Sequence, residues 1–268
     1  QFTGGKGIDI ITGAAGDDIL VGGQGNDIIT GGNDNDSLTG GSGNDTFNVD
    51  AGIDSIEDLG GTGAADEDDV LIVSNSATVN ATNIIKFVST NASKNEGTAN
   101  LTAKSSGGHI DMTLSTAGAY TITGSASTDT LIAGTGNDTL QITSAGDGNS
   151  DTMDGGSGSD TLKLASGSNI FSDNNKLKNI ETIVANASGS SVTLTGQSES
   201  FTITGGAGID TIIGGSGVDT ITGGAVNDII TGGSGNDIIT IDSGEDTIKD
   251  LGGTSGSEQD VVVVNAGA

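Results

Sequence analysis

The stretch GGSGNDIITIDSGEDTIKDLGG, residues 232–253, spaces two aspartates, Asp237 and Asp246, nine residues apart. Each aspartate is followed two positions later by an isoleucine, Ile239 or Ile248. A carboxylate paired with an apolar residue at a fixed interval is typical of a sequence repeat. The same nine-residue frame should therefore recur elsewhere in the chain.

The frame does recur, in three blocks. The first block starts at Gly4 and reads GGKGIDIIT, GAAGDDILV, GGQGNDIIT, GGNDNDSLT, GGSGNDTFN and VDAGIDSIE. A middle block reads GSASTDTLI, AGTGNDTLQ, GDGNSDTMD and GGSGSDTLK, and a last block starts at Gly205 with GGAGIDTII. Each unit has an apolar residue at the eighth place and an aspartate at the sixth. These sixth-place residues are Asp9, Asp18, Asp27, Asp36, Asp45, Asp54, Asp129, Asp138, Asp151, Asp160, Asp210, Asp219, Asp228, Asp237 and Asp246.

One apolar residue in nine predicts a strand of two or three residues with a six-residue turn before it. A helix would need apolar residues at every third or fourth position. We therefore expect an all-β fold, a parallel β-solenoid with almost no helix. Two units make one 18-residue coil, so alternate strands stack in opposite sheets. Asp9 and Asp27 then lie on one edge of the solenoid, and Asp18 and Asp36 lie on the other.

The composition points to a cation partner. The chain has 268 residues with 36 acidic and 8 basic side chains, a formal charge of −28. This excess repels nucleic acid and anionic membrane surfaces, and it opposes compaction unless counter-charge binds. No cysteine is present, and no apolar run approaches the roughly 20 residues of a membrane span, so membrane insertion is not expected. With aromatic residues at 2%, a conventional globular core is not expected either.

Ca²⁺ suits the stacked aspartates best. Carboxylates about 4.8 Å apart along an edge repel one another unless a cation bridges them. Calcium takes six to eight hard oxygen ligands at about 2.3–2.6 Å, and backbone carbonyls serve beside carboxylates. Zinc or copper would require histidine or cysteine, and the sequence offers only His109, which we expect in a solvated turn. The pattern therefore predicts multiple Ca²⁺ ions.

The pattern GGxGxDxUx, with U apolar, resembles the RTX nonapeptide repeat of secreted bacterial proteins. The resemblance implies a calcium-bound parallel β-roll, in which turn carbonyls and the sixth-place aspartates named above bind ions shared between stacked turns. It also implies type I secretion and a location outside the cell or on the bacterial surface. Some units depart from the pattern: Asp34, Ser127 and Val226 replace the fourth-place glycine. Phe201 replaces the aspartate itself and is interpreted as a roll boundary.

We expect five segments: an RTX β-roll with a capping strand (1–73), a β-rich spacer (74–123), a short roll (124–164), a β-ladder spacer (165–204) and a roll with a capping strand (205–268). The capping strands are DVLIV and DVVVV, which follow acidic loops. The spacers would either continue the solenoid or fold back as small sandwiches, and the unbroken register into the rolls favours continuation. The abrupt ends suggest a piece of a longer protein.

Three classes of function fit these features, and we expect no enzyme. Neither HExxH nor GxSxG occurs in the chain. The interspersed rolls and Thr/Ser/Ala-rich segments resemble surface-layer proteins of Gram-negative bacteria, which would make the chain a surface-layer or filament subunit that associates with itself or with other cell-surface components. The alternatives are a spacer or binding segment of an RTX adhesin and, less favoured, the calcium-folding tail of a secreted enzyme.

Overall fold

The part of the chain that the structure describes folds into β-strands and turns, as expected. The computed structural model describes residues 1–61, 68–146, 148, 150–251 and 258–265. All strands in this part pair in parallel, and it contains no α-helix. Accordingly, the described residues form no helix that is long and apolar enough to cross a membrane.

Two compact units make up the chain. Unit 1 comprises Gln1–Leu140 with Gly155–Gly158, and unit 2 comprises Gln141–Asp154 with Ser159–Ala268. Within each unit the strands alternate between facing walls, which is the arrangement of a β-solenoid. The prediction of an all-β parallel solenoid is confirmed for both units.

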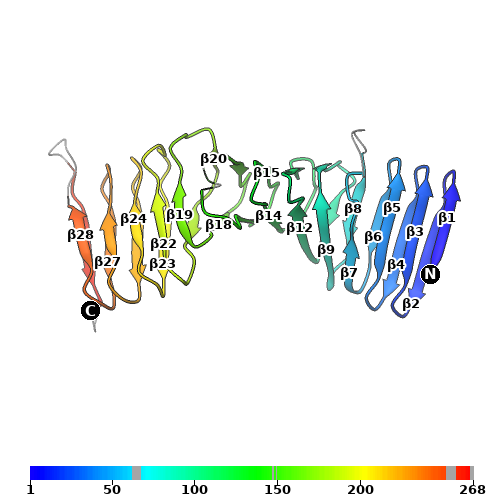
Figure 1. Cartoon of the computed structure of the whole chain (residues 1–268), viewed down its shortest axis with the longest axis horizontal. Helices are drawn as coiled ribbons and strands as arrows, with labels where there is room; N and C mark the ends of the chain where they lie inside the picture. Colours follow the sequence, from blue (N-terminus) through cyan, green and yellow to red (C-terminus); the bar gives the residue numbers. More distant parts are fainter. Residues whose placement is uncertain (62–67, 147, 149, 252–257, 266–268) are drawn as a thin grey trace. The chain divides into compact units, whose positions relative to one another are not determined.

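The first wall of unit 1 runs the whole length of that unit (Figure 1). In spatial order its strands are β1 (Phe2–Lys6), β3 (Ile19–Gln24), β5 (Ser37–Ser42), β7 (Gly52–Ile56), β9 (Ala77–Ile84), β12 (Thr98–Ala103), β14 (Tyr120–Thr123) and β16 (Thr139–Gln141). The facing strands form two sheets. One sheet holds β2 (Ile10–Ala15), β4 (Ile28–Asn33), β6 (Thr46–Val49), β8 (Val70–Val73) and β11 (Lys94–Asn95). The other sheet holds β10 (Lys86–Val88), β13 (His109–Asp111) and β15 (Thr130–Ile132).

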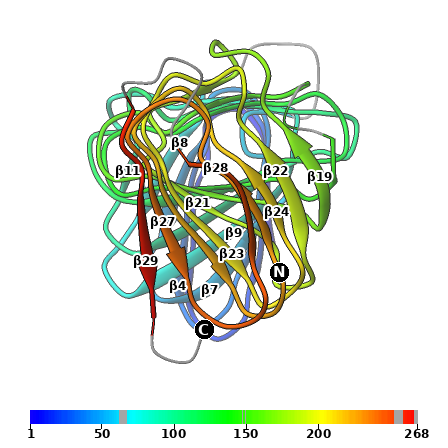
Figure 2. The same cartoon turned by 90° about the vertical axis from the view of Figure 1, so that its left-hand side faces the viewer.

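Unit 2 has the same two-walled arrangement, and Figure 2 shows β23 and β27 in one wall with β22 and β24 in the other. The first wall holds β18 (Thr161–Lys163), β21 (Thr182–Val184), β23 (Thr202–Gly206), β25 (Thr220–Gly224), β27 (Ile238–Ile241) and β29 (Val261–Val264). The second holds β19 (Gly167–Ile170), β22 (Ser190–Thr193), β24 (Thr211–Ile213), β26 (Ile229–Thr231) and β28 (Thr247–Asp250). A further pair joins β17 (Thr152–Asp154) to β20 (Leu177–Lys178).

The eighth-place side chains form the core of both rolls. Leu20 pairs in register with Leu38, which is 18 residues later, and Ile203 pairs in the same way with Ile221. All four side chains are fully buried. Since neighbouring strands are about 4.8 Å apart, each column of Ile and Leu is in continuous contact along the coil axis. This burial supplies the main apolar driving force for stacking one coil on the next.

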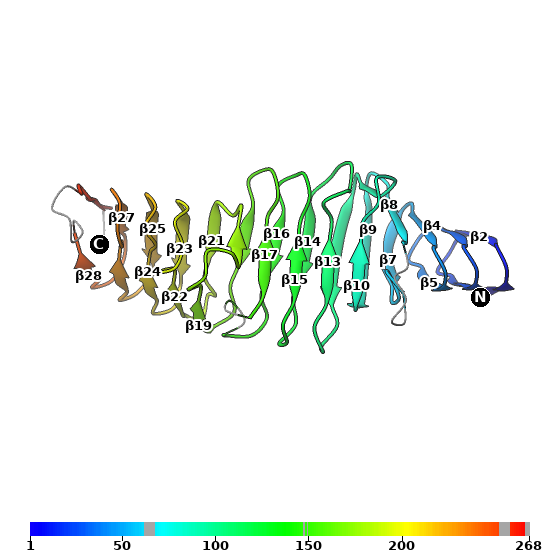
Figure 3. The ribbon, with the colours of Figure 1, turned by 90° about the horizontal axis from the view of Figure 1, so that it is seen from above.

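Strands of the predicted spacers continue this parallel pairing within each unit. In unit 1, β9 pairs with β7 and with β12 in the first wall, and β10 pairs with β13 in the facing wall (Figure 3). In unit 2, β21 pairs with β18 and with β23. The observed pairing is that of a continued solenoid, not of a fold-back sandwich. The five segment boundaries themselves stay a prediction.

The structure corrects three expectations. Strand β8 pairs with β6 on one side and β11 on the other, so it is an interior strand and not a cap. The strands β2 to β5 each have six residues, and not the predicted two or three, because their pairing continues through the first glycines of the next unit. His109 is half-buried in strand β13, where it lies in register between Lys86 and Thr130, and is not a turn residue. Residues 62–67 and 252–257, which fall within the predicted acidic loops, lie outside the described residues.

Most fourth places of the repeat have a left-handed backbone, including two where glycine is absent. Gly25 and Gly43 have φ values of 125° and 120°. Asp34 and Val226, two of the departures from the pattern, also have positive φ, at 75° and 69°. A positive φ is unfavourable for any side chain and most so for a β-branched one, so Val226 stores strain. The coil geometry thus overrides the local preference of these two residues.

Candidate calcium sites

The sixth-place aspartates of unit 1 are brought together in two ladders. The N–H of Asp9 donates a hydrogen bond to Oδ1 of Asp27 (2.8 Å), and the N–H of Asp27 donates to Oδ1 of Asp45 (2.7 Å). The second ladder joins Asp18 to Asp36 and Asp36 to Asp54, with both distances 2.9 Å. Each carboxylate thus bonds the backbone of the preceding coil. The predicted spacing of 18 residues along each edge is confirmed.

Two further ladders of the same kind lie in unit 2. The N–H of Asp210 donates to Oδ1 of Asp228 (2.8 Å), and that of Asp228 donates to Oδ1 of Asp246 (2.9 Å). On the other edge, the N–H of Asp219 donates to Oδ1 of Asp237 (2.8 Å). Buried Phe201 precedes this ladder, and its N–H donates to Oδ1 of Asp219 (2.8 Å). Phe201 therefore keeps the backbone contact but supplies no carboxylate, so the ladder begins one coil after it.

The middle repeats hold their aspartates differently. Asp129 accepts the N–H of Gly108 (2.5 Å) at Oδ1 and the N–H of Ser125 (2.7 Å) at Oδ2. Asp138 accepts the N–H of Tyr120 at Oδ1 (2.6 Å). Because both carboxylate oxygens of Asp129 are engaged by N–H donors, this residue is a poorer candidate ligand than the ladder aspartates.

Asp151 and Asp160, in unit 2, are both buried. The N–H of Asp160 donates to Oε2 of Glu181 (2.6 Å), so a glutamate occupies the next sixth-place position. The nine-residue pattern did not single out Glu181, since it stands in the spacer. The triplet Glu181-Thr182-Ile183 nevertheless keeps the acidic-x-apolar order of the repeat.

In eight of the ladder residues, the second carboxylate oxygen is left without a hydrogen-bond donor. This oxygen, Oδ2, is buried and unbonded in Asp9, Asp27, Asp36, Asp54, Asp210, Asp228, Asp237 and Asp246. Burying a charged oxygen without a partner costs several kcal/mol, so such groups occur paired, protonated or bound to a metal. A row of these atoms is the strongest structural sign of cation sites in the chain.

Backbone oxygens converge on the same places. A Cβ built on Gly22 would collide with Oδ2 of Asp27 and with the carbonyl oxygen of Gly40 in the next coil. Gly4 repeats the arrangement, because its Cβ would collide with Oδ2 of Asp9 and the carbonyl oxygen of Gly22. Each cradle therefore combines a carboxylate oxygen with a carbonyl oxygen, the hard donors that Ca²⁺ takes. The residues present fit the predicted ion.

The described residues hold no group of three or more His, Cys, Asp or Glu side chains arranged for one metal ion. A cation at these edges would therefore rely on carbonyl oxygens together with one or two carboxylates. Such a donor set suits calcium and not zinc, whose sites use three or four side-chain ligands.

Replacing Gly205 by alanine tests the cradle directly. Its Cβ would collide with the carbonyl oxygen of Gly223 and lie 2.8 Å from Oδ2 of Asp210. Since Gly205 does not have a positive φ, the substitution acts through this collision and not through backbone strain. We expect Gly205→Ala to lose about 1–3 kcal/mol of unfolding free energy in calcium, measured by urea unfolding. Ser234→Ala, at an exposed turn position, is the control, and equal losses in the two variants would contradict the cradle.

Three carboxylates of these edges lie outside the repeat pattern. Asp69 extends the first ladder, since its Oδ1 accepts the N–H of Asp45 (2.8 Å). Asp260 does the same for Asp237 (3.0 Å). Asp58 accepts the N–H groups of Gly40 (3.0 Å) and Gly41 (2.8 Å). Asp69 and Asp260 each precede a Val-rich strand, so the Asp-x-apolar triplet was the available signal.

Burial raises the pKa of four carboxylates in these ladders. The pKa is raised to about 6 for Asp54, Asp228 and Asp237 and to about 7 for Asp69, because burial removes water from the charged form. The backbone N–H donors lower these pKa values in part, and neighbouring carboxylates raise them again, as Asp36 does for Asp54. These four carboxylates thus hold protons more tightly than free aspartate does when no cation is bound.

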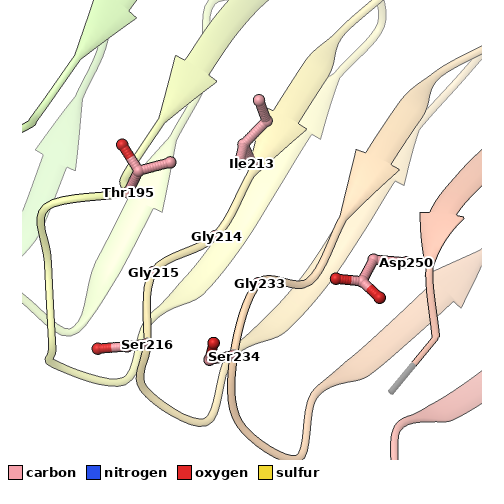
Figure 4. A pocket seen from close by; sticks show the side chains of 8 residues that line it. All are labelled: Thr195, Ile213, Gly214, Gly215, Ser216, Gly233, Ser234 and Asp250. Carbon is pink, nitrogen blue, oxygen red and sulfur yellow. The ribbon is translucent and has the colours of Figure 1, made fainter. Parts of the chain in front are cut away.

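A cavity of about 270 Å³ lies beside Asp250 in unit 2 (Figure 4). Its lining residues are Thr195, Ile213, Gly214, Gly215, Ser216, Gly233, Ser234 and Asp250. Figure 4 shows the Asp250 carboxylate on one side and the turn of Gly214 and Gly215 on the other. This lining supplies one titratable side chain, so the cavity does not bring together a catalytic pair of acid and base.

The fold and these edges define a parallel β-roll with stacked carboxylates. A family model for the RTX calcium-binding nonapeptide repeat matches residues 1–29, 21–56, 116–141, 145–172, 202–230 and 214–248. The chain belongs to this family, and every predicted site aspartate falls within the matched residues. The family is a calcium-binding one, and no catalytic family is indicated. Neither the comparison with curated proteins nor the comparison with solved structures finds a match.

Proposed function

We propose that the chain is an extracellular structural protein of a bacterial surface, a surface-layer or filament subunit whose rolls fold and become rigid when they bind calcium. The row of buried, unbonded Oδ2 atoms carries this proposal. Without a cation, each such oxygen opposes folding, and with one it becomes a ligand that joins two coils. Calcium would supply the positive charge that lets these carboxylates stay ionised inside the roll.

The demand for counter-charge is confined to the rolls. The predicted spacer 74–123 holds three lysines and two acidic residues, Glu96 and Asp111. The roll 1–73, by contrast, holds fifteen acidic residues and one lysine. Spacer coils therefore need no calcium to offset repulsion, while the roll coils do. This division supports a chain in which calcium controls only some of the segments.

The expected calcium range fits export followed by folding. Extracellular calcium modules bind with Kd values of about 10⁻⁴–10⁻³ M, so their sites are empty at cytosolic calcium and filled outside the cell. We propose that the chain leaves the cell extended, by type I secretion, and folds outside. The ladder aspartates of both units are the proposed ligands.

A calcium titration followed by far-UV circular dichroism and hydrodynamic radius tests the proposal, with magnesium as the control cation. The expected result is a calcium-specific gain of β structure with compaction, followed by growth into large ordered particles. Compaction that stops at a monomer would instead favour an adhesin spacer. Full β structure in calcium-free buffer at neutral pH would overturn the calcium-folding mechanism.

A further inference from the structure

A second ladder runs beside the carboxylates, formed by the side chains at the fifth place of the repeat. The N–H of Asn44 donates to Oδ1 of Asn26 (3.0 Å), and the N–H of Asn35 donates to Oδ1 of Asp17 (3.0 Å). In unit 2 the N–H of Glu245 donates to Oδ1 of Asn227 (2.9 Å). The same contact joins Gln259 to Asn236 (2.9 Å) and Val218 to Oγ of Ser200 (2.9 Å).

The two ladders have opposite directions. At the sixth place, the N–H of one coil donates to a carboxylate of the following coil. At the fifth place, the N–H of one coil donates to a side-chain oxygen of the preceding coil. Asn35 and Asp36 show both patterns in adjacent residues. Their four bonds are Asn35 N–H to Asp17, Ile53 N–H to Asn35, Asp18 N–H to Asp36 and Asp36 N–H to Asp54.

These hydrogen bonds in both directions fix the backbone of the turn at the residue that carries the ladder carboxylate. The N–H of Asn35 is hydrogen-bonded to the preceding coil, and the N–H of Asp36 is hydrogen-bonded to the following coil. The Asp36 side chain can then use Oδ1 for the backbone and keep Oδ2 buried in the cradle. A turn that slid or rotated relative to its neighbours would move Oδ2 away from the carbonyl oxygens.

We propose that the fifth-place oxygen is a positioning group for calcium, which sets the geometry of the ligand next to it without touching the ion. The inference rests on the proposed calcium function and concerns residues outside the ligand set. The fifth-place side chains Asn26, Asn35, Asn44, Asn227 and Asn236 are exposed, so they have no part in the core. Asp17 serves as well as asparagine, so the acceptor oxygen is the shared requirement.

The chain itself contains places where this oxygen is missing. Ile209 stands at the fifth place and is 68% exposed, an unusual position for a large apolar side chain. Within the described structure, the N–H of Asn227, one coil later, has no acceptor. Ile8, which is 75% exposed, likewise occupies the fifth place one coil before Asn26. These positions allow the role to be tested by adding a bond as well as by removing one.

The test compares Ile209→Asn, Asn227→Ala and Asn227→Asp with the wild-type chain by isothermal titration with calcium and, separately, with strontium. Ile209→Asn supplies the missing acceptor and is expected to lower the calcium midpoint by a factor of about 2–10. Asn227→Ala is expected to raise the midpoint by a similar factor, and Asn227→Asp should keep the wild-type value. Strontium is larger than calcium, so a positioning role should also change the ratio of the two midpoints.

The outcomes separate the positioning role from its alternatives. An equal shift for both ions would show that the bond only stabilises the fold, and it would overturn the proposal. Unchanged midpoints in Ile209→Asn and Asn227→Ala would overturn it as well. A wild-type chain that binds no calcium would overturn the proposed function together with this inference, and a flat wild-type titration identifies that case.

Discussion

Lowering the pH from about 7.5 to about 4.5 is expected to stabilise the rolls in calcium-free buffer and to destabilise them in calcium. The pKa values of Asp54, Asp228 and Asp237 are raised to about 6, and that of Asp69 to about 7, above the ordinary value of 3.8. Between about pH 4 and 7, the folded chain therefore binds more protons than the unfolded chain. Its free energy of unfolding without calcium must rise as the pH falls.

In calcium, the pH dependence of the free energy of unfolding has the opposite sign, because protons and Ca²⁺ compete for the same carboxylates. The stabilisation by protonation is complete below about pH 4 and is lost as the pH rises through the folded pKa values near 6 and 7. Calcium binding takes its place above that range. Thermal unfolding followed by circular dichroism, in buffer freed of calcium by a chelating resin and in excess calcium, measures both slopes. Slopes of the same sign in the two buffers would contradict the assignment of these carboxylates to cation sites.

A matched variant ties the slopes to one residue. Asp237→Asn removes one titrating group while keeping an oxygen that can accept the N–H of Asp219. The variant should flatten the calcium-free slope, since one proton fewer is taken up on folding. It should also weaken calcium binding, because the amide oxygen carries no charge.

Much of this fold can be predicted from the nine-residue period of the sequence alone. Burial of Leu20 and Ile29 follows from the eighth-place pattern, because one inward side chain per nine residues fits only a short strand. The grouping of Asp9 with Asp27 follows from the two-strand coil. These inferences succeed because a solenoid repeats one local geometry, so each unit is supported by the same contacts as its neighbours.

The predictions that fail concern places where the nine-residue repeat is interrupted or where contacts join different coils. Asp69 lies 24 residues after Asp45, not 18, so that coil is six residues longer, and the strand after Asp69 is interior although the sequence predicts a cap there. The fifth-place ladder was also missed. Asn35 and Asn44 read in sequence as ordinary turn residues, since asparagine favours turns for local reasons. Only the stacking of coils shows that their side chains accept hydrogen bonds from another turn.

Asp228→Ala is expected to cause the largest loss of calcium binding in unit 2. Asp228 is buried, its Oδ1 accepts the N–H of Asp210 (2.8 Å), and its Oδ2 has no donor. The substitution removes a candidate ligand and also leaves the Asp210 N–H without its acceptor, which costs about 1–3 kcal/mol. We expect the calcium midpoint to rise by a factor of about 10 or more, which is about 1.4 kcal/mol or more. The titration should also become less cooperative, because the ladder shares Asp228 between coils.

Asp228→Asn separates the two effects. The amide oxygen can still accept the Asp210 N–H, so the backbone contact is kept while the charge is lost. In calcium this variant should bind nearly as weakly as Asp228→Ala. In calcium-free buffer it should be more stable than the wild-type chain, because a buried carboxylate beside Asp210 and Asp246 is gone. Glu245→Ala, which removes an exposed carboxylate next to the ladder, is the control for net charge. If Glu245→Ala shifts the calcium midpoint as much as Asp228→Asn, the acidic residues act through net charge alone. If only Asp228→Asn shifts it, the buried ladder binds the ion.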